Sequence, residues 1–178
     1  HLHHRYFLQH GKEVIVMSTT DRQAERISNS RRVAEEALKS GDDFPEFIET
    51  LTPKELGYLG EALACSYLEE RGLEVVERQY RCREGEADII AHDLDSDEIV
   101  LVEVKTRRAA RSSALEIYPE EAVDERKRLR YARIASCYVM EHYPVTSLRF
   151  DIIAITLLSG GAARITHVQD AFEWDAQR

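Results

Sequence analysis

Two short segments of the sequence carry acidic and basic side chains at a spacing that suits metal-assisted chemistry. Asp88 lies in the apolar segment 86–91, and Glu103 and Lys105 lie in the β-branched segment 99–106. Because side chains alternate between the two faces of a strand, Glu103 and Lys105 share one face. An acidic, polar stretch separates the two segments, and this pattern predicts a hairpin.

The register of this hairpin decides which charged side chains meet. If the hairpin folds symmetrically about its turn, Asp88 lies opposite Glu103, and Glu86 lies opposite Lys105. Directly opposed residues have Cβ atoms about 4.5–5.5 Å apart. Two carboxylates at that separation repel each other unless a cation lies between them. The pair therefore predicts a site for Mg²⁺ or Mn²⁺, which bind carboxylate oxygens and water.

Such a site suits phosphodiester hydrolysis. The ion would neutralise charge on a phosphate and lower the pKa of a bound water. Lys105 could orient or deprotonate the attacking water, or stabilise the charge of the transition state. The same spacing also fits a half-exposed hairpin whose Glu–Lys pair only contributes to stability, so the spacing alone leaves both interpretations open.

A helix is predicted immediately before these segments. Thr52 and Pro53 form an N-cap and first helical position, and apolar residues then recur at helical spacing until Gly72. Glu61 lies at the edge of the apolar stripe, on the same side of the helix as the small residues Gly57 and Ala64. Small residues there would let the helix approach a sheet and bring one carboxylate to it. The alternative is an ordinary solvated glutamate.

A second helix is predicted from Pro119 to about His142, and it carries a basic stripe. Between positions 105 and 133 there are nine Lys or Arg and five Asp or Glu, although the whole chain has a net charge of −9. This local excess indicates a phosphate-contacting surface, against the alternative of a solvated amphipathic face. The expected contact residues are Arg107, Arg108, Arg126, Lys127, Arg130 and Arg133.

The remaining elements complete an α/β pattern. Strands are expected near 73–76, at 148–158 and at 164–168, in addition to the hairpin. The order of helix, strand, hairpin, helix and two strands predicts a mixed central β-sheet flanked by helices.

The first 50 residues differ from the rest and are expected to form an N-terminal extension to a domain at 51–178. Four histidines crowd the first ten positions, and Met17 is typical of a start. Residues 1–16 therefore suggest a tag-like or upstream segment, with a metal-binding tract as the alternative. A charged helix is expected over 21–39. The extension contains none of the candidate ligands and is expected to be dispensable for the fold.

Composition excludes several classes of protein. With 43% hydrophobic and 32% charged residues, the chain is typical of a globular protein and not of a collagen or a disordered chain. Its apolar runs are strand-sized, so no membrane span or signal peptide is expected. Three cysteines at irregular spacing indicate reduced thiols, and we expect a cytoplasmic location.

These motifs together resemble the YraN-type family of uncharacterised bacterial proteins. The resemblance covers about Leu51 to Trp174. It rests on the following segments: Gly60-Glu61, Tyr80-Arg81, Gly85 to Ala91, Val102 to Arg107, Arg126-Lys127, Arg149 to Ile155, and Ala171-Phe172. The family is grouped with the restriction-endonuclease-like superfamily of the PD-(D/E)xK type, which includes Holliday-junction resolvases. Ala87 departs from the β-branched residue expected at its position, and the first fifty residues have no counterpart in the family pattern.

The resemblance implies a restriction-endonuclease-like core and assigns roles to the site. Asp88 and Glu103 would be metal ligands, Lys105 the catalytic lysine and Glu61 the helix-borne carboxylate, with Glu86 at a further acidic position. The leading hypothesis is a Mg²⁺-dependent endonuclease acting on duplex, branched or damaged DNA. One alternative is a catalytically silent module that binds nucleic acid or protein, and another is a small-molecule phosphohydrolase, which the basic helix disfavours. Whether the chain forms a homodimer, and whether the substrate is DNA or RNA, stays open.

Overall fold

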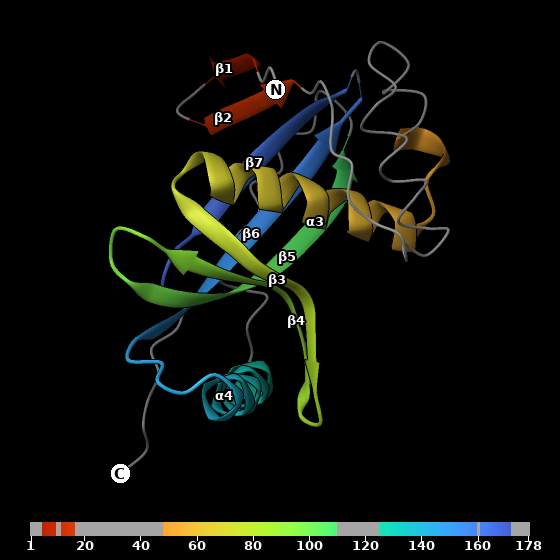
Figure 1. The fold of residues 1–178 in the computed structure, drawn as a ribbon. Helices are drawn as coiled ribbons and strands as arrows, with labels where there is room; N and C mark the ends of the chain where they lie inside the picture. Colours follow the sequence, from red (N-terminus) through yellow and green to blue (C-terminus); the bar gives the residue numbers. More distant parts are fainter. Residues whose placement is uncertain (1–4, 10–11, 17–47, 110–124, 160, 172–178) are drawn as a thin grey trace, which may run out of the picture. The chain divides into compact units, whose positions relative to one another are not determined.

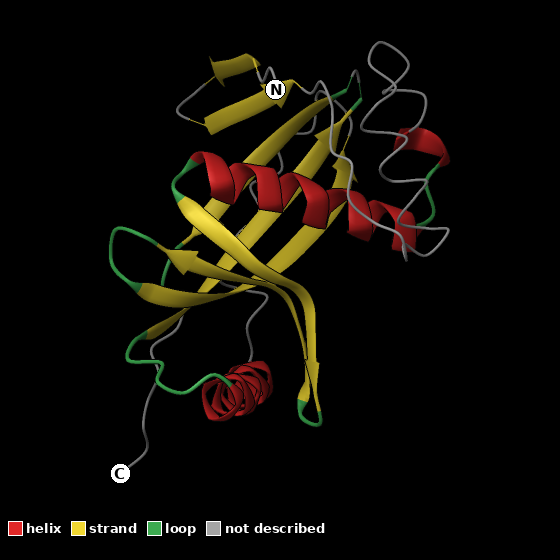
Figure 2. Ribbon diagram, viewed as in Figure 1, coloured by secondary structure: helices red, strands yellow, loops and turns green. Residues whose placement is uncertain are grey.

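The computed structural model describes residues 5–9, 12–16, 48–109, 125–159 and 161–171 (Figure 1). Along these ranges, two long helices separate groups of two, three and two strands, as the colours of Figure 2 show. The two long helices are α3 (Pro53–Glu70) and α4 (Glu125–Glu141). The strands are β1 (Arg5–Gln9), β2 (Lys12–Val16), β3 (Leu73–Cys82), β4 (Gly85–Asp93), β5 (Glu98–Ala109), β6 (Leu148–Leu158) and β7 (Ala162–Val168).

The strands form one sheet in the order β1-β2-β7-β6-β5-β4-β3. The pairs β1–β2, β2–β7, β3–β4 and β4–β5 are antiparallel. Strands β5 and β6 run parallel, because backbone hydrogen bonds join their two beginnings (Ile99 to Ser147) and their two ends (Ser159 to Ala109). Helix α4 lies between them in the chain, as a parallel connection requires. The expected α/β class with a mixed sheet and flanking helices is confirmed.

Helix α3 begins with the capping box that the sequence predicts. The Thr52 amide donates to the Glu55 carboxylate at 2.7 Å, and the Glu55 amide donates to the Thr52 hydroxyl at 3.3 Å. The helix ends before Gly72, whose φ of +84° is easily reached only by glycine. Its apolar stripe is buried, with Leu59 and Leu68 completely inaccessible.

Strand β3 is longer than the expected 73–76. It continues to Cys82 because its polar second half pairs with β4, from Glu77 opposite Ile90 to Cys82 opposite Gly85. A register shift between Val75 and Glu77 interrupts the alternation of side chains. An irregular polar strand of this kind has no regular period-two pattern, which is why the sequence did not reveal it.

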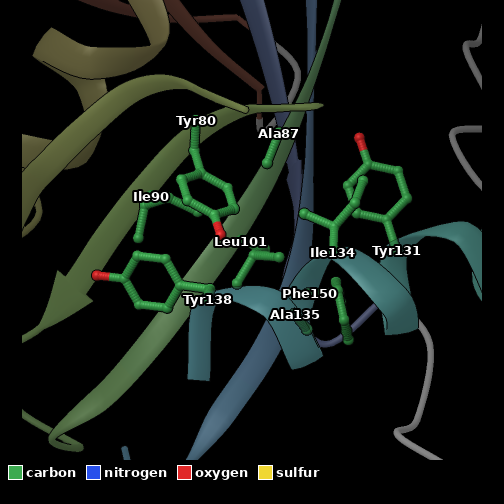
Figure 3. Close-up of a cluster of buried hydrophobic side chains, with 9 residues drawn as sticks. All are labelled: Tyr80, Ala87, Ile90, Leu101, Tyr131, Ile134, Ala135, Tyr138 and Phe150. Atoms are coloured by element: carbon green, nitrogen blue, oxygen red, sulfur yellow. The ribbon is translucent and has the colours of Figure 1, made fainter. Parts of the chain in front are cut away.

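The chain divides into two compact units, each described by itself. Unit 1 contains residues 1–63, 105–116 and 154–166, and unit 2 contains residues 64–104, 117–153 and 167–178. In unit 1, Ile48, Leu59, Ile155 and Leu157 are almost completely buried. In unit 2, side chains of β3, β4, β5 and β6 surround the inner face of α4 (Figure 3). This cluster consists of Tyr80, Ala87, Ile90, Leu101, Tyr131, Ile134, Ala135, Tyr138 and Phe150.

The N-terminal residues contain structure that the sequence did not predict. Segments 5–9 and 12–16, expected to be tag-like, form the paired strands β1 and β2, and β2 also pairs with β7. The fold also includes residues before position 51, because Ile48 is buried. The helix expected at 21–39 and the expected start of the second helix at 119–124 lie outside the described residues.

Candidate metal and nucleic-acid site

The β4–β5 hairpin has the register expected from its symmetry. Asp93 lies opposite Glu98, and the pairing continues residue by residue to Ile89 opposite Val102. Asp88 and Glu103 are the next position along this register, one step beyond the last paired residues. Ile90 and its partner Leu101 both pack in the cluster around α4. Alternation along the two strands therefore directs Asp88 and Glu103 toward the same face as this pair.

Strand β4 pairs with β5 only between Ile89 and Asp93, whereas it pairs with β3 as far as Gly85. Just beyond this ladder, the Asp88 Oδ2 atom accepts a hydrogen bond from the Val104 backbone amide at 2.8 Å. A partly buried backbone N–H needs an acceptor, and here a carboxylate supplies it. Asp88 is therefore held close to β5 at the point where the two strands stop pairing.

Glu103 forms an ion pair with a residue of the basic helix. Its Oε1 atom lies 2.8 Å from Lys127 Nζ, and the two side chains are only 13% and 22% exposed. Both line a small pocket together with Leu101, Tyr131, Phe150, Asp151 and Ile152. Lys127 was predicted as a phosphate contact, but it lies on the inner side of α4, four residues before the buried Tyr131. That spacing alone could not have revealed the inward position, because Arg130 lies four residues before the buried Ile134 and is exposed.

Glu61 and Lys105 belong to unit 1. Glu61 is buried on α3, and Lys105 is exposed on β5. Helix α3 contacts β5 closely at Gly60, where a Cβ atom would lie 1.7 Å from Thr106 Oγ1. The close approach therefore occurs at Gly60. At Gly57, where the sequence pattern predicted it, an added Cβ atom would have no heavy atom within 4 Å. Since neighbours along a strand face opposite sides, Lys105 points away from the face that contacts Gly60.

The structure gives three other predicted residues specific contacts. Glu86 is exposed and pairs with Arg81 across the β3–β4 hairpin at 3.3 Å. Arg107 Nε donates to the Thr156 hydroxyl at 3.3 Å. Arg108 donates to the carbonyl oxygens of Ile48, at 2.7 Å, and of Leu51. Arg108 therefore fastens the chain before α3 to β5, which is a structural role that the sequence did not predict.

The outer side of α4 carries the expected basic stripe. Arg126, Arg130 and Arg133 are exposed, whereas Ile134 on the inner side is buried. Arg130 also lies beside the β3–β4 turn, since a Cβ at Gly85 would be 3.4 Å from its Nε atom. Three arginines at successive turns form a surface that can contact successive phosphates.

A buried charge network in unit 2 was not predicted. Arg149 contacts Asp93 at 2.7 Å, Glu98 at 3.1 Å and Asp151 at 3.1 Å. Asp151, whose side chain is 0% exposed, also contacts His167 at 2.8 Å and accepts the Asp170 amide at 3.0 Å. The sequence signalled Arg149 and Asp151 only as part of a family motif. The network joins the β4–β5 turn to β6 and to the end of β7.

The electrostatics of this network favour the charged forms of Asp93 and Glu98. Burial alone would raise the pKa of Asp93, but hydrogen bonds from Arg149 and from the Ser96 and Asp95 amides lower it overall. Hydrogen bonds from Ser147 and Ser96, together with Arg149, likewise lower the pKa of Glu98. Hydrogen bonds to Asp151, Asp93 and Glu98 raise the pKa of Arg149 against the opposing effect of burial.

Asp88 and Glu103 offer carboxylate oxygens, the donors that a hard divalent cation prefers. Among the described residues, no group of three or more His, Cys, Asp or Glu side chains is arranged to hold a metal ion. Mg²⁺ does not require such a cage, because one or two carboxylates, several waters and substrate phosphates complete its octahedral shell. Asp88 and Glu103, at one register position of adjacent strands, fit this smaller requirement.

The chain matches a known protein family along most of its described length. The model of "Uncharacterised protein family UPF0102" matches residues 60–155. A UPF0102 protein from Syntrophus aciditrophicus is 42% identical over 118 residues, which are 66% of this chain and 87% of that protein. The chain belongs to the UPF0102 family, which confirms the YraN-type resemblance carried by its motifs.

Two solved structures are also partly similar. A repair endonuclease from Pyrococcus abyssi aligns with a TM-score of 0.33 and 22% identity, over 57% of this chain and 39% of that chain. A structure of an EndoMS complex with double-stranded DNA aligns with a TM-score of 0.31 and 18% identity, over 90% of this chain and 58% of that chain. Separately, none of the helices in the described ranges has the length and apolar character of a membrane span.

Proposed function

We propose that this protein is a Mg²⁺-dependent endonuclease that hydrolyses phosphodiester bonds in DNA. The observation that supports the proposal is the hairpin register, which pairs residues as far as Ile89 and Val102 and so makes Asp88 and Glu103 the next position, with Asp88 held against β5 by the Val104 amide. Two carboxylates that lie close together are stabilised by a shared cation. The exposed arginines of α4 give the same unit a surface suited to a polyanion.

Each proposed group has a defined task. Asp88 and Glu103 would hold the ion, which when bound would supply charge neutralisation at the phosphate and a more acidic water. Lys105 follows Glu103 by two positions on β5 and is exposed, so its amine can donate to a phosphate oxygen or to the attacking water. Glu61 and Glu86 stay candidate carboxylates from the sequence prediction.

Lys127 adds a feature that the sequence prediction lacked. Its ammonium group neutralises Glu103 in the absence of an ion, and it lies on the same helix as the arginine stripe. An ion or a phosphate entering the site would compete for these two charges. We therefore infer that Lys127 releases Glu103 when metal and substrate bind, and that it then contacts a phosphate oxygen.

A second candidate function is supported by the same ion pair. If Lys127 permanently replaces a cation at Glu103, the domain binds nucleic acid through α4 without cutting it. In that case the arginine stripe would still determine affinity, whereas the carboxylates would contribute only to stability. The two candidates differ in what divalent ions do to the protein and to its substrate.

The experiment is a cleavage assay on end-labelled linear, flapped and four-way DNA with Mg²⁺, Mn²⁺ or EDTA. We expect cleavage with either ion, none in EDTA, and loss of cleavage in Asp88→Asn, Glu103→Gln and Lys105→Met. Glu74→Gln is the matched control, because it neutralises an exposed carboxylate on β3, the other strand that pairs with β4. DNA binding without cleavage of any substrate under all conditions would favour the silent module.

A further inference from the structure

Two exposed apolar side chains lie at the end of the basic helix in unit 2. Met140, in the last turn of α4, is 79% exposed, and Tyr143, two residues after the helix, is 83% exposed. The His142 amide still donates a helical hydrogen bond to the Tyr138 carbonyl oxygen at 3.0 Å, so Tyr143 directly follows the helix. Single exposed apolar residues are ordinary, but these two stand together at the end of a basic surface.

The chain around Tyr143 is held in place by its neighbours. Tyr138 points from α4 toward the strands and is only 3% exposed (Figure 3). The His142 ring stacks on Tyr138, with ring centroids 4.1 Å apart and an interplanar angle of 18°. Val145 packs against the same buried cluster. Tyr143 is therefore an exposed ring between two anchored residues, and a flat ligand that binds it has little chain to order.

Met140 lies on the same side of α4 as two members of the arginine stripe. Arg126, Arg133 and Met140 follow each other at intervals of seven residues, which brings them to one side of a helix. At about 1.5 Å per residue, Arg133 lies about 10 Å from Arg126 along the axis, and Tyr143 about 15 Å beyond Arg133. One strand of a duplex rises about 3.4 Å per nucleotide, so these intervals span about three and four nucleotides.

The two parts of this surface suit different parts of a nucleic acid. Arginine side chains bind phosphates, whereas a phenol ring and a thioether can pack against the face of a base. Base faces inside a duplex are covered by their neighbours, so the apolar part requires an unpaired base. Glu141, the acidic residue at this end of α4, accepts a hydrogen bond from the Tyr80 hydroxyl at 2.8 Å, which directs its carboxylate toward β3.

We propose that the outer side of α4 binds DNA at the point where a strand leaves a duplex, with Tyr143 stacked on an unpaired base. The arginine stripe contacts phosphates of the paired part, and Met140 packs against the first unpaired nucleotide. This inference rests on the proposed function, because it requires DNA as the ligand, and it adds the kind of DNA that the surface prefers.

The test is fluorescence anisotropy of the full chain in EDTA, with a blunt duplex and a duplex carrying a single-stranded overhang, both with the same number of phosphates. We expect the overhang DNA to bind about fivefold more tightly or better, since an aromatic ring gains this much from one stacked base. Tyr143→Ala should remove the preference, whereas Tyr143→Phe, which keeps the ring, should retain it. Leu94→Ala is the matched control, because Leu94 is also an exposed apolar residue of unit 2 but lies in the β4–β5 turn.

The outcomes separate this inference from the proposed function. Equal affinity of the wild type for the two DNAs, or an unchanged preference in Tyr143→Ala, would overturn the inference while DNA binding stays intact. Loss of the preference in Leu94→Ala as well would also overturn it. Binding of neither DNA would contradict the inference and the proposed function together. Because EDTA removes divalent ions, an absence of cleavage in the assay above would contradict only the proposed function.

Discussion

The candidate site depends on single hydrogen-bonding and charged contacts. Symmetry of the turn predicted the register of the β4–β5 pairs, because a hairpin with regular alternation admits few registers, and Asp88 and Glu103 lie one step beyond the last of these pairs. The two contacts that hold these carboxylates, from the Val104 amide and from Lys127, were not predicted. Both arise where β4 stops pairing with β5, and no local sequence pattern shows where a ladder ends.

Gly60 provides a direct test of the close packing between α3 and β5. We predict that Gly60→Ala destabilises the protein by about 1–3 kcal/mol, because its Cβ would overlap Thr106 Oγ1, Cβ and Cγ2 at 1.7, 2.7 and 2.9 Å. Thr106→Ala should restore part of the loss, since it removes two of these three atoms. Urea denaturation of the single and double variants measures the coupling.

Gly57 is the matched control for that change. It lies on the same helix, and a Cβ there meets no atom within 4 Å. We expect Gly57→Ala to be neutral or to stabilise the protein by up to about 1 kcal/mol, through helix propensity. Equal effects of the two alanines would contradict the close contact between α3 and β5.

Among the secondary-structure elements, α4 combines two functions on its two sides. Its inner side closes the hydrophobic cluster of unit 2, and its outer side carries three exposed arginines. The amphipathic pattern predicted both sides, since helical periodicity is the strongest signal in a single sequence. In strand β3 the sequence pattern was not informative. The second half of β3 is a strand because it pairs with β4, and the composition of the segment does not show this.

The arginine stripe is expected to control DNA affinity. Replacing Arg126, Arg130 and Arg133 with alanine should weaken binding and reduce the slope of log affinity against log salt by up to about three units. Fluorescence anisotropy with labelled duplex DNA at several salt concentrations measures both effects. Arg128→Ala, which removes another exposed arginine from a different side of α4, should change the slope less. An unchanged slope in the triple variant would show that the stripe is only a solvated face.

The charge network at the β4–β5 turn predicts how stability depends on pH. The folded protein lowers the pKa of Asp93 and of Glu98 below the ordinary values of 3.8 and 4.5. The folded state therefore binds fewer protons than the unfolded state, and its stability is greatest above these ordinary values. We predict that the free energy of unfolding decreases as pH falls below about 4.5, when these groups become protonated.

Asp93→Asn tests this origin of the acid sensitivity. The variant removes the charge that Arg149 holds at 2.7 Å, so it should be less stable at pH 7 and should lose less on acidification. Asp95→Asn, in the exposed part of the same turn, serves as the control. Urea denaturation between pH 3 and 7 supplies the data. Parallel stability curves for the wild type and Asp93→Asn would show that other groups cause the acid sensitivity.

At the scale of the whole molecule, buried contacts include a residue before the predicted domain boundary at residue 51. The expected boundary at residue 51 followed from the strong capping signal at Thr52, which marks the start of a helix and not the start of a domain. Ile48 lies in the core of unit 1, and Arg108 binds its carbonyl oxygen. These contacts bring distant parts of the chain together, and composition alone does not reveal them.

Ile48 tests where the fold begins. We predict that Ile48→Ala lowers the free energy of unfolding by about 2–5 kcal/mol, because it removes a side chain that is only 1% exposed. Glu49→Ala, at the exposed next position, should change stability little. Thermal and urea unfolding of both variants measure the difference. A near-neutral Ile48→Ala would restore the boundary at residue 51.

The central claim is that Asp88 and Glu103 share a divalent cation, and Mn²⁺ titration followed by electron paramagnetic resonance tests it most directly. Asp88→Asn keeps an oxygen that can accept the Val104 amide but removes the charge, so it separates metal binding from folding. Lys127→Met removes the cation that competes for Glu103. We predict one Mn²⁺ site per chain, weakened more than about tenfold by Asp88→Asn and strengthened by Lys127→Met. Equal Mn²⁺ affinity in the wild type and in Asp88→Asn, or no binding in either, would contradict the account.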